Sequence, residues 1–191
     1  FGGTYFPPRD GVRGSRKGFL SILKEYRGRY LDNPSQLVSQ AQDIALRVVQ
    51  NAAPTPGLSV PSARAITQSA AHVLSTFDEM HGGFGRAPKF PRSHNLEFLA
   101  RYYHRSGDPK ALKAMVTTLT KMAAGGMYDQ VGGGFHRYSV DEKWLVPHFE
   151  KMLYDNAQLV IAYLEAFQLT GRGDFSRVAQ ETLDYVVREM T

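Results

Sequence analysis

The sequence of 191 residues contains no cysteine. Within this chain, that absence excludes disulfide bonds, thiol catalysis and metal sites built on thiolates. No apolar run approaches the length of a membrane-spanning helix, and no signal-peptide pattern is present. We therefore expect no membrane partner, and we take a cytoplasmic setting as the default. The chain begins with Phe1 rather than methionine, so we expect it to be a fragment or a processed product.

The net charge of +5 arises at one end of the chain. Residues 1–30 hold seven basic and two acidic side chains, and the remaining residues carry sixteen of each sign. A nucleic-acid-binding domain would spread its basic side chains over one folded face. We therefore predict no nucleic-acid partner. The apolar content of 42% is ordinary for a globular protein.

Apolar residues recur at helical spacing along most of the chain. Before the middle of the chain we expect a short strand-like run at Thr4-Tyr5-Phe6 and helices over residues 16–31 and 35–51. Three prolines and one glycine in residues 52–61 predict a linker and a domain boundary. Five further helices are expected, over residues 62–80, 93–105, 109–123, 147–169 and 175–190.

One motif occurs twice in the second part of the chain. Gly82-Gly83-Phe84-Gly85-Arg86 recurs 51 residues later as Gly133-Gly134-Phe135-His136-Arg137. Each copy lies in a long loop between two predicted helices, and a short glycine–aspartate turn follows each pair. Antiparallel hairpins would gather the long loops at one end, where we expect any functional site. This alternation predicts an all-α fold, the start of a helical solenoid or toroid that this chain is too short to close.

The second long loop lies within residues 125–156, the densest group of polar, aromatic and titratable side chains in the sequence. Five glycines within ten positions indicate sharp turns or close backbone approaches. A loop of this length in a compact domain is usually functional. Pro147 suits a first helical position, so we expect His148 and Glu150 in the first turn of the next helix. Tyr154 would then share a helix face with Glu150.

His148 and Glu150 are the candidate catalytic pair, because a histidine base and a carboxylic acid suit proton transfer at a sugar carbon or glycosidic cleavage. The alternative is that Glu150 complements the helix dipole and His148 is a packed polar residue. The candidate substrate contacts are the nearby polar, charged and aromatic side chains His136, Arg137, Asp129, Tyr154, Asp155, Lys89 and Trp144.

Each substrate contact except Tyr154 has a structural alternative. The histidine–arginine pair after the triple glycine would stabilise its own loop, and Asp129 would shape a turn. Asp155 would form a helical ion pair with Lys151. Lys89, between two prolines, would be a solvated charge on a stiff turn. Trp144, the only tryptophan, would fill space between hairpins.

We predict no metal and no cofactor. No two histidines are closely spaced on one helix face, and thiol ligands are absent. The Gly-Gly-Phe loops also lack the strand–loop–helix context and the Gly-Lys-Ser/Thr ending of phosphate-binding loops.

Three long motifs carry a resemblance to a known family. They are Gly3-Thr4-Tyr5-Phe6-Pro7-Pro8, the first Gly-Gly-Phe loop with Ala87-Pro88-Lys89-Phe90-Pro91, and residues 132–155 with Gly-Gly-Gly-Phe-His-Arg-Tyr-Ser-Val-Asp and Trp-Leu-Val-Pro-His-Phe-Glu-Lys-Met-Leu-Tyr-Asp. Through these motifs the whole chain resembles the spermatogenesis-associated protein 20 family, known in bacteria as YyaL-like proteins.

The resemblance implies a thioredoxin-like domain joined to an (α/α)6 toroid of the six-hairpin glycosidase type. Residues 1–51 would be the C-terminal tail of the thioredoxin-like domain, and residues 62–191 would be the first part of the toroid. The family's Cys-His-Trp-Cys-type motif lies upstream of Phe1, so this chain cannot perform dithiol chemistry. Toroids of this type include glycoside hydrolases and sugar 2-epimerases, which is an analogy of fold alone.

Two functional hypotheses follow from the residues and the resemblance. The first is a carbohydrate-processing or sugar-binding toroid, with a carbohydrate or other small molecule as its partner. The second is a non-catalytic interaction module that presents clients to the thioredoxin-like domain. A deep polar cavity at the long-loop end would favour the first, and a filled or apolar groove the second. Because an incomplete toroid leaves apolar faces open, we also expect self-association.

Overall fold

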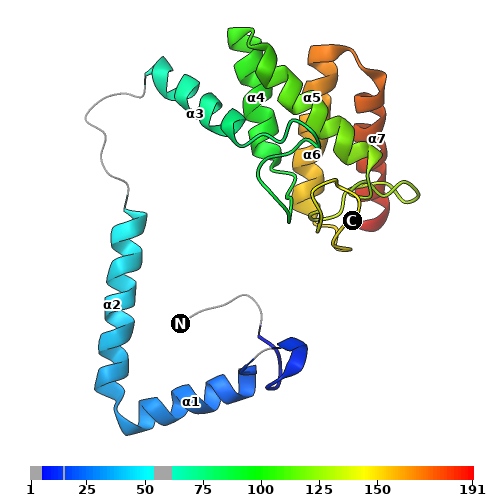
Figure 1. Cartoon of the computed structure of the whole chain (residues 1–191). Helices are drawn as coiled ribbons and strands as arrows, with labels where there is room; N and C mark the ends of the chain where they lie inside the picture. The colour runs from blue at the N-terminus through cyan, green and yellow to red at the C-terminus, as the bar shows by residue number, and fades with distance from the viewer. Residues whose placement is uncertain (1–5, 15, 54–61) are drawn as a thin grey trace. The chain divides into compact units, whose positions relative to one another are not determined.

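The computed structural model describes residues 6–14, 16–53 and 62–191, and the chain divides into two units, Phe1–Val60 and Pro61–Thr191. Every named element in the described residues is a helix (Figure 1), which confirms the predicted all-α class. None of these helices combines the length and apolar character needed to cross a membrane.

The first unit contains the 3-10 helix η1 (Val12–Gly14) and the helices α1 (Phe19–Asp32) and α2 (Pro34–Ala52), close to the predicted ranges. The carboxylate of Asp10 accepts hydrogen bonds from the Gly18 N–H at 2.6 Å and the Ser21 hydroxyl at 2.9 Å, which joins the preceding turn to the start of α1. Neither helix contains a buried residue. Most of the predicted strand-like run and residues 54–61 of the predicted linker lie outside the described residues.

The second unit contains the five predicted helices: α3 (Ala63–Ser75), α4 (Ser93–Ser106), α5 (Pro109–Ala124), α6 (Leu153–Thr170) and α7 (Gly173–Glu189). The predicted start of α5 is confirmed, because the Asp108 side chain accepts a hydrogen bond from the Lys110 N–H at 3.0 Å and Pro109 is the first helical residue. The core lies between α4, α5, α6 and α7. Tyr163 of α6 is fully buried there, and its hydroxyl donates to the Leu119 carbonyl of α5 at 2.8 Å.

Two predicted helix boundaries are wrong. The helix expected to reach residue 80 ends at Ser75, because the carboxylate of Asp78 accepts hydrogen bonds from two following N–H groups and turns the chain. The helix expected from Pro147 begins at Leu153, because the preceding residues pair as extended backbone, with a bridge between Ser139 and Pro147. A proline φ angle fits extended backbone as well as a first helical turn.

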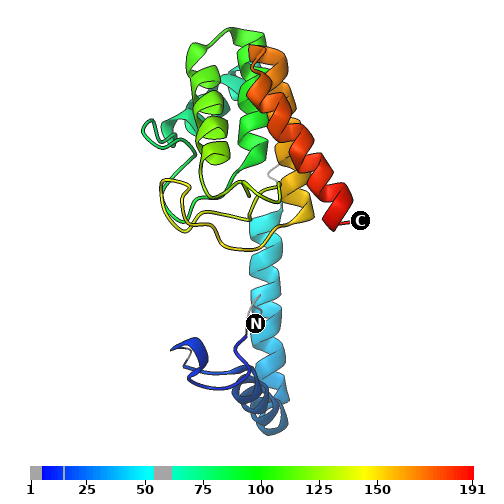
Figure 2. The same ribbon diagram turned by 90° about the vertical axis from the view of Figure 1, so that its right-hand side faces the viewer.

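The hairpins place the loops as the alternation predicted. In Figures 1 and 2 the long loops, over residues 76–92 and 125–152, gather at one end of the helices. The short turns between α4 and α5 and between α6 and α7 lie at the other end. The long-loop end is therefore where distant parts of the sequence meet.

Candidate functional site

The two Gly-Gly-Phe loops have the same internal structure. The Asp78 N–H donates to the Gly83 carbonyl at 3.0 Å, and the Asp129 N–H donates to the Gly134 carbonyl at 2.9 Å. Each aspartate carboxylate also accepts hydrogen bonds from the N–H groups two and three residues later, at 2.9 to 3.0 Å. The repeated motif is therefore a repeated structure. Asp129 shapes a turn, as the structural alternative to a substrate contact predicted.

Each copy also contains a lysine that closes the loop. The Lys89 ammonium lies 2.6 Å from the Asp78 carboxylate, and the Lys151 ammonium lies 2.8 Å from that of Asp129. Each ammonium also donates to the carbonyl of the glycine four residues after its aspartate, at 2.8 and 2.7 Å. The Lys89 side chain is 0% exposed. The solvated-charge interpretation of Lys89 is therefore wrong, since a buried ammonium needs such acceptors.

An aromatic ring lies against the second glycine of each loop. A Cβ atom on Gly83 would lie 2.4 Å from a ring carbon of Trp144, and one on Gly134 would lie 2.4 Å from a ring carbon of Tyr185. Both glycines have φ angles in the left-handed region, at +83° and +75°. The lysine of each copy lies over the same ring, 5.6 Å and 4.2 Å from its centroid.

Trp144 joins the two loops. Its indole N–H donates to the His81 carbonyl of the first loop at 2.9 Å, and its own carbonyl accepts from the Gly126 N–H at 2.8 Å. The side chain is fully buried. The packing interpretation of Trp144 fits this position, because neither face of its ring is open to a sugar.

The predicted catalytic pair lies before α6 and not within it. The Arg137 N–H donates to the Glu150 carbonyl at 2.7 Å, and the His148 N–H donates to the Tyr138 carbonyl at 2.8 Å. These bonds hold residues 137–140 beside residues 146–150. The expectation that His148 and Glu150 occupy a first helical turn is therefore wrong, as is the helix face that Glu150 would share with Tyr154.

The loop pairing nevertheless brings a base, an acid and a cation together. The Glu150 carboxylate lies 3.1 Å from the Arg137 guanidinium and 3.5 Å from Nδ1 of His148. The His148 ring stacks on Tyr138 with centroids 4.7 Å apart and an interplanar angle of 13°. The Arg137, His148 and Glu150 side chains are 40 to 44% exposed. The cluster is an open surface in this chain rather than the deep cavity that would favour an enzyme.

Three neighbouring groups have shifted pKa values. Burial, with a smaller effect of the Lys151 charge, lowers the pKa of His136, whose Nδ1 has no hydrogen-bond partner. Burial raises the pKa of the Asp155 carboxyl, and the Arg137 guanidinium opposes that shift. The Gly132 N–H and the Lys151 ammonium hold the pKa of Asp129 far below its usual range. Asp129 is thus fixed as a carboxylate, whereas burial disfavours the charged form of Asp155.

The predicted site residues fall into two groups. The first group lies at the long-loop end and contains His136, Arg137, His148 and Glu150. Tyr154 and Asp155 lie in the first turn of α6, and both interact electrostatically with Arg137. Lys89, Asp129 and Trp144 instead form the framework of the loops. The predicted ion pair between Asp155 and Lys151 is not formed, since Lys151 precedes α6 and binds Asp129.

Asn156 is a framework residue that the sequence reasoning missed. It is fully buried, and its amide accepts from the Phe135 N–H at 2.6 Å and donates to the Phe135 carbonyl at 3.1 Å. It therefore fastens the second loop to α6. The sequence signal that could have identified it is that Asn156 is a polar residue among the apolar positions of a predicted helix.

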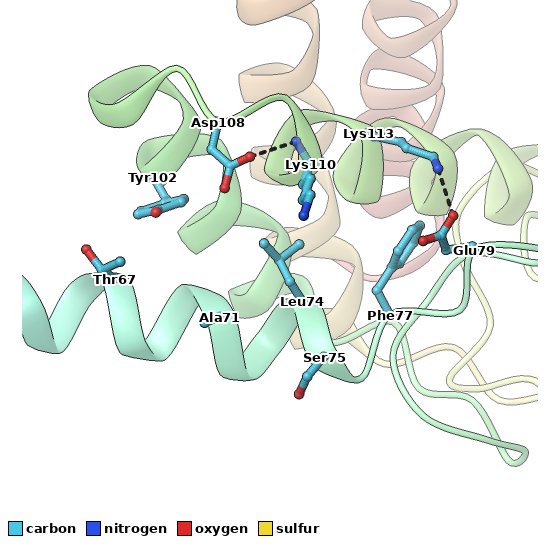
Figure 3. Close-up of a pocket in the computed structure, with 10 residues that line it drawn as sticks. All are labelled: Thr67, Ala71, Leu74, Ser75, Phe77, Glu79, Tyr102, Asp108, Lys110 and Lys113. Carbon is cyan, nitrogen blue, oxygen red and sulfur yellow. Dashed lines mark hydrogen bonds and ion pairs between the residues drawn. The ribbon is translucent and has the colours of Figure 1, made fainter.

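The most spacious of the described pockets lies elsewhere. It has a volume of about 570 Å³ and lies between α3, α4 and α5, with a Glu79–Lys113 ion pair at its rim (Figure 3). Within the described residues, no group of three or more histidine, aspartate or glutamate side chains is placed to hold a metal ion. The titratable cluster and this pocket are separate features.

Comparison of the sequence with known proteins identifies its relatives. Spermatogenesis-associated protein 20 of Homo sapiens is 42% identical over 197 residues, and that of Mus musculus is 39% identical over the same length. The chain is homologous to spermatogenesis-associated protein 20 over its whole length. The predicted family resemblance is thereby confirmed. Each match covers 100% of the chain but only 25% of the relative, so the chain spans a quarter of the mammalian proteins. No protein-family model matches the sequence.

A solved structure shows the same fold. Cellobiose 2-epimerase from Spirochaeta thermophila DSM 6192 matches with a TM-score of 0.54 and 21% sequence identity, over 67% of this chain and 38% of the epimerase. That enzyme is an (α/α)6 toroid, so the predicted toroid class is confirmed. The thioredoxin-like tail over residues 1–51 stays a prediction.

Proposed function

We propose that the long-loop end of the second unit is a carbohydrate-processing site that acts by proton transfer at a sugar carbon. The observation that carries the proposal is the contact of one carboxylate, that of Glu150, with both Arg137 and His148. The fold shared with a sugar epimerase supports the substrate class, by analogy alone.

The geometry supports a division of roles within the pair. His148, in its neutral form, would accept the proton from the carbon next to the sugar's carbonyl group. Glu150, 3.5 Å from Nδ1 of His148, would balance the charge that the imidazole gains, while Arg137 holds the carboxylate in place. Asp155, in its protonated form, would return a proton to the opposite face of the carbon. The product would then have the same atoms as the substrate and the inverted configuration.

Aromatic and polar side chains beside the pair would bind the sugar. The Phe149 ring is 82% exposed and packs edge-on against His136, with centroids 5.2 Å apart. An exposed ring of this kind can stack on the apolar face of a sugar. Tyr154, which interacts with Arg137, and His136 would supply polar atoms for the sugar hydroxyls.

The test measures exchange of a carbon-bound proton in the intact natural protein. Reducing mono- and disaccharides are incubated in D2O and followed by NMR. We expect deuterium at the carbon next to the carbonyl, about 100-fold slower or more in His148→Ala, because general acid–base groups contribute about that much or more. His104→Ala, exposed at the end of α4 next to the short turn, is the matched control and should retain the rate. Exchange or epimerisation that survives His148→Ala, or none with any sugar in the folded protein, would overturn the proposal.

Exposed apolar side chains favour a second candidate, a protein-interaction module. Besides Phe149, Val131 is 99% exposed and Leu145 is 66% exposed in the same loop. Exposed apolar groups of this kind suit binding to an unfolded client, which a thioredoxin-like domain would then reduce. Binding of an unfolded polypeptide that still carries a disulfide, lost in Val131→Ser and Leu145→Ser, without sugar chemistry, would support this candidate.

A further inference from the structure

Lys89 is connected to His148 by a short series of contacts. Its backbone N–H and carbonyl both bond to Ser139, each at 2.8 Å, so residue 89 forms a third extended segment beside residues 137–140. The next ring along, Phe90, packs on Tyr138 with centroids 4.8 Å apart. Tyr138 in turn stacks on His148 at 4.7 Å.

The side chain of Lys89 points the other way, into the first Gly-Gly-Phe loop. There its ammonium binds Asp78 and the Gly82 carbonyl and lies over the Trp144 ring. Lys89 therefore holds two structures at once: the first loop through its side chain, and the extended segment that contains Tyr138 and Ser139 through its backbone. Breaking the Lys89–Asp78 ion pair would release the segment that contains Tyr138 from the first Gly-Gly-Phe loop. The buried Lys89 ammonium makes both of its strong bonds within that loop.

Lys151 makes the equivalent connection in the second copy. It follows Glu150 directly in the chain, and its ammonium binds Asp129 and the Gly133 carbonyl. The two lysines thus fix the two halves of the cluster, Lys89 through the ring beside His148 and Lys151 through the backbone at Glu150. Neither has an ion-pair or ring contact with His148 in the described structure.

We infer that Lys89 and Lys151 are equivalent positioning residues of a duplicated loop, and that the buried Lys89–Asp78 pair sets the placement of the His148 ring on Tyr138. Only the catalytic consequence of this inference rests on the proposed function. The placement itself can be measured without any substrate.

The experiment observes the His148 ring by proton NMR in the whole chain. The stacked Tyr138 ring shifts the imidazole protons of His148 upfield, and His148→Ala assigns the signal among the six histidines. In Lys89→Met we expect that ring-current shift to be lost while circular dichroism remains helical. Asp78→Asn keeps the side-chain size and removes the charge, so it should also reduce the ring-current shift. It takes the place of Lys89→Met if that variant fails to fold.

Lys113→Met is the matched control, since it removes an exposed lysine paired with Glu79 at 2.9 Å. It should leave the His148 signal in place. An unchanged His148 signal in a folded Lys89→Met or Asp78→Asn protein would overturn the inference. Sugar turnover is measured separately. If the variants lose the ring-current shift but the unsubstituted protein turns over no sugar, only the proposed function is refuted. If the unsubstituted protein turns over sugar but the His148 signal does not move in the variants, only the positioning role is refuted.

Discussion

Among single residues, Asp129 provides the most direct test of the loop framework. Asp129→Ala removes the side-chain acceptor of two backbone N–H groups and the Lys151 ion pair, whereas Asp129→Asn keeps a side-chain oxygen for the N–H groups. Because hydrogen bonds to charged groups contribute about 1.5 to 3 kcal/mol, we expect Asp129→Ala to lower the free energy of unfolding by about 3 kcal/mol and Asp129→Asn by about half of that. Urea unfolding measures both. Asp184→Ala, exposed on α7, is the control, and equal losses in all three variants would contradict the assignment.

His136 makes the stability depend on pH near neutrality. Its pKa in the folded protein lies below the value of about 6.5 expected in the unfolded chain. Below that pH the unfolded chain binds the proton more readily than the folded protein, so His136 stabilises the fold above about pH 6.5 and this contribution is lost as the pH falls.

We expect the free energy of unfolding to decrease between about pH 7 and pH 5, and the decrease to be smaller in His136→Leu. Urea unfolding at a series of pH values provides the measurement. His104→Ala should keep the slope of the unsubstituted chain. A slope that His136→Leu leaves unchanged would show that the burial of His136 does not penalise its charged form.

Much of the cluster could be predicted from residues alone, and the framework could not. The repeated Gly-Gly-Phe motif and its density of polar residues correctly placed His136, Arg137, His148 and Glu150 at one end. The lysine pairs left no such pattern, because Lys89 follows its aspartate by 11 positions and Lys151 by 22. Their equivalence depends on the path of the chain through space, which local spacing does not encode.

Among the helices, the start of α5 was predicted and the start of α6 was not. Aspartate followed by proline fixes a helix start through local bonds, so Asp108 and Pro109 sufficed. Pro147 is compatible with both a helix and an extended segment, and pairing with residues 137–140 decides between them. Tertiary contacts override local preference where that preference is weak.

The cap of α5 gives a prediction at this scale. Asp108→Ala removes the side-chain acceptor for the Lys110 N–H, so we expect a loss of about 1 kcal/mol in the free energy of unfolding. Ser62→Ala is matched to it, because Ser62 precedes α3 but makes no capping hydrogen bond, and it should change little. Thermal or urea unfolding of the two variants provides the comparison. A loss in Ser62→Ala as large as that in Asp108→Ala would mean that the measured cost does not come from the cap.

For the whole molecule, the alternating loop lengths predicted a solenoid or toroid of helical hairpins and the position of the long loops, and the family resemblance selected the toroid. Long loops and short turns that alternate along antiparallel helices can only collect at opposite ends. The reaction is not encoded in this way, since one toroid fold carries many chemistries. The cluster is also open at its surface, so a ligand can reach the Arg137, His148 and Glu150 side chains.

The distribution of apolar surface leads to the prediction of self-association. Helix α2 buries none of its residues, and Val48 and Val49 are 60% and 64% exposed on it. Apolar faces of this kind associate with one another in water. We expect light scattering to give a mass above the monomer value of 21.3 kDa at micromolar concentrations, and a lower mass for a Val48→Lys, Val49→Lys double variant.

A fragment of residues 61–191 separates the sources of this association. The second unit has its own core of fully buried side chains, so it should fold and melt cooperatively by itself. If α1 and α2 drive association, the fragment will be closer to a monomer than the whole chain. Equal association of both would instead point to the exposed apolar residues of the long loops, such as Phe149 and Val131. A whole chain that remains a 21.3 kDa monomer with a single cooperative melt would contradict the prediction, and it would mean that neither set of exposed residues is a binding surface for a second copy.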